Sequence, residues 1–202
     1  MSSQPIRDQI ADHLLTPMNS ALIMIDYQPT QVNSIRSMDH QQLVQNSVRV
    51  ARIATTYGLP IVLSTVNVKT GINQPTIQPL LEVLPGVPEI DRTTINSWED
   101  VEFKKAVRAT GRRKLIMAAL WTEACLSFPA LDALREGYEV YPLVDAVGGT
   151  SLDAHNRALE RMVQAGAKLT SWVQLACELQ RDWARKETAA ALVDILFGKP
   201  KQ

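Results

Sequence analysis

Short apolar runs that do not alternate with polar residues recur along the chain, separated by segments with helical periodicity. An apolar run without alternation predicts a strand that is buried on both faces, as in parallel sheets covered by helices on both sides. The pattern therefore predicts a three-layer α/β/α fold of the Rossmann-like type, with a doubly wound, mainly parallel six-stranded sheet in the order 3-2-1-4-5-6. The expected strands lie at 21–25, 61–66, around Ile90, 115–120, 138–144 and 168–170.

The segments between these runs repeat apolar residues near a spacing of 3.6 and predict helices. Pro142 lies inside the fifth run and argues against its boundaries, because proline is normally kept out of central strands. We expect one main domain at 18–185, an N-terminal extension at 1–17, and a C-terminal tail at 186–202 that contributes to a subunit contact. The expected helices lie at 43–57, 77–84, 99–109, 122–136, 153–164 and 172–185.

Length and charge narrow the class of protein. A chain of 202 residues is long enough for one domain with a substantial core. Lys plus Arg and Asp plus Glu both total 21, and this balance argues against a nucleic-acid partner. No apolar stretch is long enough to cross a bilayer, and the first residues lack the apolar core of a signal peptide. Two cysteines make a disulfide framework unexpected, so we expect a cytoplasmic protein without membrane contact.

Polar residues at the ends of the apolar runs mark the expected ligand site. In an open α/β sheet, ligands bind beyond the carboxyl ends of the strands, where the strand order reverses. Asp26 ends the first run, with Gln28 two positions later, and Asn67 ends the second. Arg92 follows the third run and Cys125 follows the fourth. If strands one and four are neighbours, Asp26 and Cys125 face one cleft that binds a small-molecule substrate.

Cys125 stands where a strand passes into a helix, together with Trp121 and Thr122. Unpaired N–H groups and the helix dipole favour a thiolate there, so we expect a lowered thiol pKa. Asp26 is a candidate base for the thiol proton, and the same N–H groups are candidate donors to an oxyanion. We expect Gln28, Asn67, Trp121 and Thr122 to bind the substrate.

Other interpretations of these residues remain open at this point. A free cysteine in an apolar neighbourhood is often a small buried hydrophobe, and Asp26 is equally explained as a turn or capping residue. Arg92 is also explained as a surface ion-pair residue. The histidines show no metal-ligand spacing, and no glycine-rich phosphate loop follows the first run, so we expect neither a metal nor a cofactor.

Six segments, taken in order and with their spacing, resemble the isochorismatase-like cysteine hydrolase superfamily, and most closely its YcaC-like group. The resemblance extends from about residue 20 to residue 185. The segments read ALIMIDYQ, RTTINSWED, KLIMAALWTEACLSFPALDAL, EGYEVYPLVDAVGG, AHNRALERMVQAGAKLTSW and ACELQRDW.

The resemblance implies a catalytic triad of aspartate, lysine or arginine, and cysteine. Asp26 matches the aspartate, Cys125 matches the nucleophile of the Thr-x-x-Cys pattern, and Arg92 best matches the third member. The resemblance further implies a cis peptide bond between Leu120 and Trp121, and assembly into ring-based octamers. We expect an amidase-type hydrolase that acts through a thioester intermediate; the alternative is a non-catalytic or redox-responsive oligomeric binding protein with the same fold.

Three departures from the family pattern limit which activity the resemblance implies. Ala119 stands where the family often has glycine, and Trp121 is bulkier than the usual residue. The loop after the second run, STVNVKTGINQ, lacks the histidine of the nicotinamidase metal set. True isochorismatases lack the nucleophilic cysteine, so Cys125 disfavours hydrolysis of isochorismate.

Overall fold

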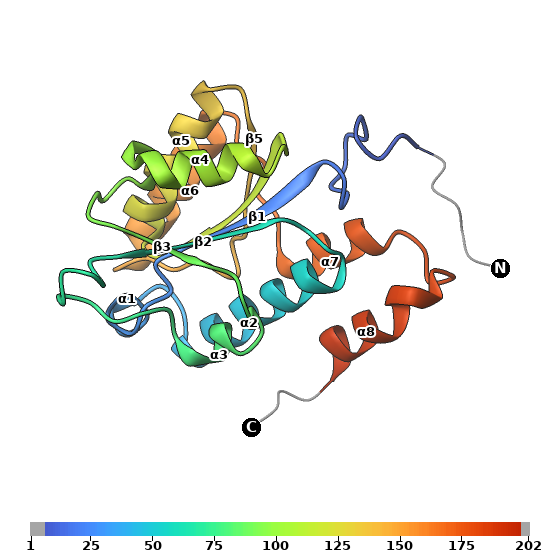
Figure 1. Ribbon diagram of the computed structural model, residues 1–202, viewed down its shortest axis with the longest axis horizontal. Helices are drawn as coiled ribbons and strands as arrows, with labels where there is room; N and C mark the ends of the chain where they lie inside the picture. The colour runs from blue at the N-terminus through green and yellow to red at the C-terminus, as the bar shows by residue number, and fades with distance from the viewer. Residues whose placement is uncertain (1–6, 199–202) are drawn as a thin grey trace.

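Five apolar segments form a parallel sheet that lies between two layers of helices (Figure 1). The computed structural model describes residues 7–198. Every residue of the first and fourth strands is buried, which explains why these runs do not alternate. The strands are β1 (Ser20–Ile25), β2 (Ile61–Val66), β3 (Glu89–Arg92), β4 (Lys114–Ala119) and β5 (Glu139–Pro142).

The strand order is β3-β2-β1-β4-β5, and each neighbouring pair is parallel. The predicted three-layer, doubly wound α/β class is therefore confirmed. β1 lies at the centre, and its last residue, Ile25, pairs with Ser64 of β2 and Ala119 of β4. This register brings the carboxyl ends of β1, β2 and β4 to one edge of the sheet, where the chain order reverses.

The prediction of a sixth strand at 168–170 is wrong, because the sheet has five strands. Segment 168–170 makes only an isolated bridge between Leu143 and Thr170, with Lys168 and Thr170 donating to the carbonyls of Val140 and Pro142. Because the Pro142 carbonyl faces this segment, its nitrogen faces the same way and not toward β4. The missing N–H of Pro142 therefore removes no hydrogen bond from the β4–β5 ladder.

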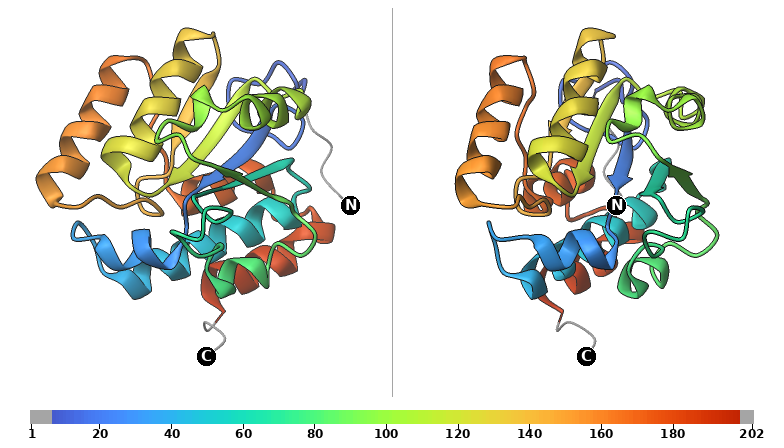
Figure 2. Two further views of the ribbon diagram at one scale, coloured as in Figure 1. Left: turned by 60° about the vertical axis from the view of Figure 1, so that its left-hand side comes forward. Right: turned by 90° about the vertical axis from the view of Figure 1, so that its left-hand side faces the viewer.

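Helices cover both faces of the sheet, as Figures 1 and 2 show. Side-chain caps begin several of them: Asp39, Asp100 and Ser151 each accept a backbone N–H of the first helical turn. One layer contains α4 (Val101–Ala109), α5 (Ser127–Arg135) and α6 (Leu152–Gln164). The other side carries α1 (Pro29–Ser34), α2 (His40–Thr56), α3 (Gln78–Leu81), α7 (Trp172–Gln180) and α8 (Lys186–Phe197).

Several expected helix boundaries differ from the structure, including the start of α2 at His40 and the end of α3 at Leu81. The helix predicted at 122–136 is divided into a π-helix, η2 (Thr122–Leu126), and α5. The helix predicted at 172–185 ends at Gln180, because Arg181 adopts a positive φ of 61° that a helix cannot contain. The helix predicted from residue 99 is preceded by a short 3₁₀ turn, η1 (Ser97–Glu99), and α1 was not predicted.

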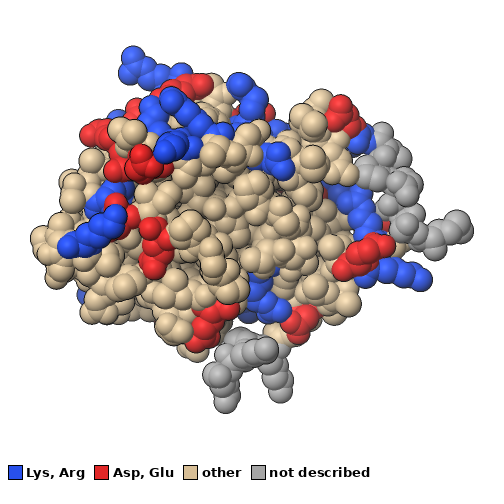
Figure 3. All heavy atoms as spheres, in the orientation of Figure 1, with Lys and Arg blue, Asp and Glu red and all other residues tan. Residues whose placement is uncertain are grey.

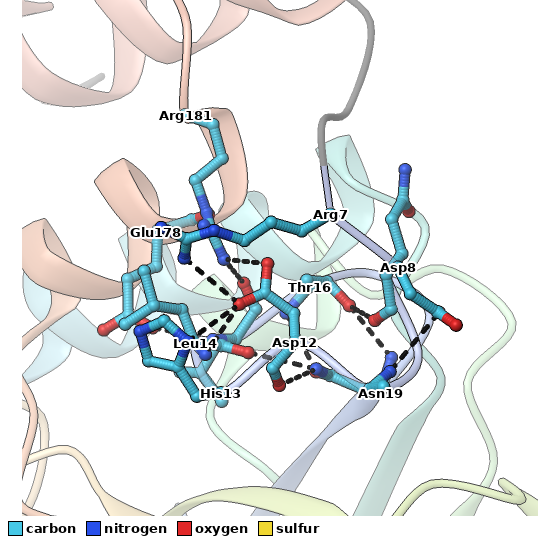
Figure 4. A network of polar contacts seen from close by, with 12 residues as sticks. Arg7, Asp8, Asp12, His13, Leu14, Thr16, Asn19, Glu178 and Arg181 are labelled. Atoms are coloured by element: carbon cyan, nitrogen blue, oxygen red, sulfur yellow. Dashed lines mark hydrogen bonds and ion pairs between the residues drawn. The ribbon is translucent and has the colours of Figure 1, made fainter.

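The described part of the predicted N-terminal extension is fixed to the amino end of the sheet (Figure 4). Asp12 pairs with Arg181 at 3.2 Å, and Glu178 accepts the Leu15 N–H at 2.7 Å. The buried Lys114 donates from Nζ to the carbonyl oxygens of residues 12, 13 and 14 at 2.6, 2.9 and 3.0 Å. Residues 1–6 of the extension and 199–202 of the tail lie outside the described residues.

The described part of the predicted tail is α8, which packs against α2 and α7. Leu192 and Ile195 are buried in the core, and Arg52 of α2 pairs with Asp194 at 2.5 Å. Within residues 7–198, no helix is long and apolar enough to cross a membrane.

Substituting Lys114 tests how the N-terminal segment is held. We expect Lys114→Met to lower the free energy of unfolding by about 2 kcal/mol, because three buried carbonyls lose a charged donor. Urea denaturation measures this change. Lys105→Met is the matched control, since its side chain is 74% exposed, and it should change the free energy by less than about 0.5 kcal/mol. Equal effects of the two substitutions would contradict this role of Lys114.

Candidate active site

Asp26 is placed by the end of β1. Its N–H donates to the Ser64 carbonyl at 2.9 Å, which continues the pairing with β2. Its φ of 61° then turns the chain sharply off the sheet, a conformation that aspartate tolerates better than most residues. The Asp26 side chain is completely buried at the carboxyl edge of the sheet.

Arg92, the last residue of β3, reaches across β2 to Asp26. Nη1 and Nη2 donate to Oδ1 and Oδ2 of Asp26 at 2.7 and 2.8 Å, a bidentate ion pair between two fully buried side chains. Nη1 also contacts Ser64 Oγ at 3.2 Å and the Thr65 carbonyl at 3.0 Å on β2. Burial lowers the pKa of Arg92, but the hydrogen bonds and charge of Asp26 more than offset this, and the net shift is upward.

Cys125 lies in η2, which begins directly after β4 and the cis peptide bond between Leu120 and Trp121. The family resemblance implies a cis bond at this position. The cysteine is 7% exposed, and a backbone hydrogen bond from Trp121 acts to lower the pKa of its thiol. Since β4 neighbours β1, the turn brings Cys125 to Asp26, which acts on the thiol through its charge and a hydrogen bond. The structure thus brings Asp26, Arg92 and Cys125 together.

The expectation of a lowered thiol pKa is wrong for the resting site. Burial and the neighbouring Asp26 raise the pKa of Cys125 to about 12, and Arg92 and the Trp121 N–H offset only part of this. At neutral pH the thiol therefore keeps its proton beside the Asp26 carboxylate. Burial, the largest cause, and the charge of Asp26 on the neighbouring strand together outweigh the groups that favour the thiolate.

Gln28 and Asn67 hold the loops around the site. Gln28 is completely buried, and its amide bonds to backbone groups of Val66 and Gln74 at 2.6 to 3.1 Å. These contacts join the turn after β1 to the loop after β2, so its amide is engaged by the fold. Asn67 also has a φ of 61°, and its N–H donates to the Arg92 carbonyl at 2.8 Å. Its side chain is partly exposed, and it stays a predicted substrate contact.

Trp121 and Thr122 are anchored to elements on either side of the nucleophile turn. The Trp121 indole N–H donates to Ser34 Oγ of α1 at 2.6 Å. The Thr122 hydroxyl contacts His155 Nδ1 of α6 at 2.8 Å, and the Thr122 N–H donates to the Gly148 carbonyl at 2.9 Å. The Thr122 N–H is therefore already engaged and is not a free donor to an oxyanion.

Sequence reasoning missed several residues that build this site. Tyr27 is fully buried and donates to the Ala146 carbonyl, and burial raises its pKa. The sequence signal for Tyr27 is its position directly after Asp26, which places it beside the site. A Cβ on Gly148 would lie 2.7 Å from Ile35, so only glycine fits between this segment and the end of α1. The Gly148-Gly149 pair is the sequence signal for that close approach; nothing in the sequence indicates Ser34 or His155.

Three buried polar atoms near Arg92 have no hydrogen-bond partner among the described residues. They are Arg92 Nε on β3, Thr94 Oγ1 on the loop that follows, and Ser97 Oγ at the start of η1. Because buried polar atoms are normally paired, these atoms are candidates to contact a polar substrate group or water. Within residues 7–198, no group of three or more histidine, cysteine or acidic residues is arranged to hold a metal ion.

A hollow of about 600 Å³ lies elsewhere, at the amino end of β1. Arg7, Asp12, Tyr57 and Arg181 are among its lining residues, and Asp26, Arg92 and Cys125 are not. The six residues of β1 separate it from Asp26 by about 20 Å. We place the candidate active site at Cys125 because the buried ion pair and the nucleophile occur together only there in the described part of the chain.

Comparison with known proteins gives one family. The isochorismatase domain model matches residues 20–174. The probable hydrolase YcaC of Escherichia coli K12 is 37% identical over 166 residues, which are 82% of this chain and 79% of that protein.

Two crystal structures are also similar to the chain. YcaC from Pseudomonas aeruginosa, determined with hexane-2,5-diol and covalent acrylamide, gives a TM-score of 0.86 at 35% identity, covering 92% of this chain and 91% of that one. YcaC from E. coli, described as an octameric hydrolase of unknown specificity, gives 0.86 at 34% identity, covering 96% and 93%.

The pH dependence of Cys125 alkylation tests the electrostatics of the site. A raised pKa means that thiolate is scarce below it, so alkylation should rise with pH without a plateau between about pH 7 and 10. Asp26→Asn removes the anion that raises the pKa and leaves Arg92, so alkylation at a fixed pH should become about 10-fold faster or more.

The rate is measured by mass spectrometry in a Cys177→Ser background. In the unsubstituted chain, the exposed Cys177 serves as the internal reference. A plateau near neutral pH, or slower alkylation in Asp26→Asn, would contradict the raised pKa.

Proposed function

Because the chain belongs to the isochorismatase family of hydrolases, we propose that it hydrolyses a small amide or a related acyl compound, with Cys125 as nucleophile and Asp26 as base. The observation that carries the proposal is the buried Asp26–Arg92 ion pair against the Cys125 thiol. A structural cysteine would not require a buried carboxylate next to its sulfur, since burying an anion is costly. A carboxylate that contacts the thiol is the arrangement that proton removal during attack requires.

The proposed acylation begins with the neutral thiol. Asp26 accepts the thiol proton while the sulfur attacks the substrate carbonyl, and a carbon–sulfur bond forms. The carbon–nitrogen bond then breaks, the amine takes the proton from Asp26, and a thioester remains on Cys125. In deacylation, water gives a proton to Asp26 as its oxygen attacks the thioester. The carbon–sulfur bond breaks, the acid leaves, and the proton returns to the sulfur.

Arg92 has an electrostatic and orienting role in this proposal. Arginine stays protonated, so it cannot carry protons between the reacting groups. Its two terminal nitrogens hold both oxygens of Asp26 and balance the negative charge. Arg92 Nε, together with Thr94 and Ser97, is left for a polar group of the substrate or the attacking water.

We assign the developing oxyanion to the backbone N–H groups of Trp121 and Cys125. The Trp121 backbone acts to lower the pKa of the Cys125 thiol, which supports an N–H close enough to serve an oxygen on the carbon bonded to that sulfur. The indole of Trp121, which is held by Ser34, and the side chain of Asn67 form the proposed substrate contacts. The bulky Trp121 limits the size of the acyl group.

We further propose that the chain forms a homo-oligomer, with the octamer described for the E. coli relative as the expected state. Trp183 and Phe197 are 58% and 77% exposed, which a monomer would leave in water. Figure 3 shows one face whose centre carries few charged side chains, while Lys, Arg, Asp and Glu gather toward its edge. The subunit contact predicted for the tail is assigned to α8.

The cytoplasmic location stays a prediction, which the two free thiols favour.

Acrylamide and an activated ester test the nucleophile. The P. aeruginosa relative was determined with covalent acrylamide, so we expect acrylamide to form one adduct at Cys125 in the Cys177→Ser protein. p-Nitrophenyl acetate should give a burst and an acetylated protein by intact mass after an acid quench. Cys125→Ala should lose the adduct and the burst, and lower turnover at least about 10³-fold. Full turnover by Cys125→Ala would remove Cys125 as the nucleophile.

Light scattering tests the assembly. The unsubstituted chain should have the mass of an oligomer at micromolar concentration, because exposed apolar side chains on α8 are buried between subunits. Phe197→Asp places a charge at this contact and should shift the mass toward smaller species. A monomer in the unsubstituted chain would contradict the proposed assembly, and an unchanged mass for Phe197→Asp would exclude α8 from the contact.

A further inference from the structure

One side chain of α6 contacts the nucleophile turn directly. His155 Nδ1 lies 2.8 Å from Thr122 Oγ1, and Thr122 is the first residue of η2. Thr122 is completely buried, directly follows Trp121 and shares η2 with Cys125, three residues further on. A displacement of Thr122 would therefore move both the Trp121 N–H and Cys125, the two groups of this turn that the proposed mechanism uses.

Thr122 is held at two points outside its own turn, one on the segment between β5 and α6 and one on α6 itself. Its hydroxyl meets His155, and its N–H donates to the Gly148 carbonyl at 2.9 Å. The backbone hydrogen bond holds the main chain of Thr122. The side-chain bond adds a second contact and gives the turn one defined orientation.

The base of the His155 side chain packs closely against Gly149, while the residue as a whole is only partly buried. An added Cβ on Gly149 would lie 2.6 Å from Glu123 Oε2 and 3.0 Å from the His155 Cβ. Glu123 is itself held by Thr150, whose N–H and hydroxyl donate to Oε1 at 2.9 and 2.6 Å. Burial lowers the pKa of His155 although Glu123 opposes this, so the ring is neutral at neutral pH. A neutral ring accepts from or donates to a hydroxyl equally well.

We propose that His155 is a positioning residue, which holds the Trp121 N–H and Cys125 in attack geometry through its hydrogen bond to the Thr122 hydroxyl. This inference rests on the proposed function, because it names a residue that supports the same nucleophile. His155 contacts neither the thiol nor Asp26 by any described hydrogen bond, so it acts through Thr122 and not on the reacting atoms.

A double-mutant cycle on the hydrogen bond tests the proposal, with p-nitrophenyl acetate as the probe substrate. His155→Ala and Thr122→Val should each lower kcat by about 10- to 100-fold with KM nearly unchanged, because attack geometry and not binding is lost. The double variant should be no slower than either single variant, since both remove the same contact.

Two further variants separate positioning from folding. His155→Asn places a polar atom near the position of Nδ1, and it should recover most of the lost rate. Arg157→Ala is the matched control on α6, because its side chain is 72% exposed and pairs only with Glu160 in the described structure. Thermal unfolding of all variants identifies those that fail to fold. Wild-type kcat in His155→Ala, additive effects in the cycle, or no recovery in a folded His155→Asn would each overturn the proposal.

Acrylamide alkylation of Cys125 in the same variants needs no turnover. Loss of the ordered Trp121 N–H removes a contact that favours the thiolate, so His155→Ala and Thr122→Val should be alkylated several-fold more slowly, and His155→Asn at nearly the normal rate. If Cys125→Ala kept its turnover, the proposed mechanism would fail, and the coupling of His155 to Thr122 would be judged by alkylation alone. Unchanged alkylation in His155→Ala would then overturn it.

Discussion

The buried ion pair between Arg92 and Asp26 constrains the rest of the site. Two charges with no exposure require good geometry and hydrogen bonds to most of their remaining polar groups, and within residues 7–198 Arg92 Nε is the one side-chain atom of the pair without a partner. Arg92 starts on β3 and must cross β2, where Ser64 and Thr65 provide contacts, to reach the end of β1. The pair therefore forms only with the strand order β3-β2-β1 and with this register. The sheet topology and the chemistry of Cys125 depend on each other for this reason.

The central sheet could be predicted from the sequence because burial on both faces leaves a signature in every residue. β1, β2 and β4 begin and end within one residue of the predicted runs. The agreement is close because none of these strands has an exposed position, so apolar residues fill both of their faces. The edge of the sheet has no such signature. Segment 168–170 pairs through a single bridge, and its composition does not distinguish a bridge from a strand. The end of α7 depends on the backbone conformation of Arg181, a non-glycine residue that gives no warning of a positive φ.

The convergence of Asp26, Arg92 and Cys125 could also be predicted, because the carboxyl ends of parallel strands meet at one edge. Their catalytic roles rest on the family resemblance and remain proposals. What the sequence could not predict is where each side chain points and what surrounds it. Gln28 was expected to face the substrate, but its amide is engaged by the backbone of the next loop. The contact between His155 and Thr122 joins residues 33 positions apart, and although both lie in segments that resemble the family, nothing in those segments indicates that the two side chains meet.

The direction of the Cys125 pKa shift has a consequence for the reaction class. An anion that is close enough to accept the thiol proton also disfavours a resting thiolate, because the two negative charges repel each other. Oxidation and metal binding require the thiolate, and both are therefore slow at a thiol that keeps its proton. This weighs against a redox-responsive role. Acyl transfer has no such requirement, because the proton leaves as the carbon–sulfur bond forms. The site is thus suited to react with a bound, oriented carbonyl and to remain inert toward dissolved oxidants.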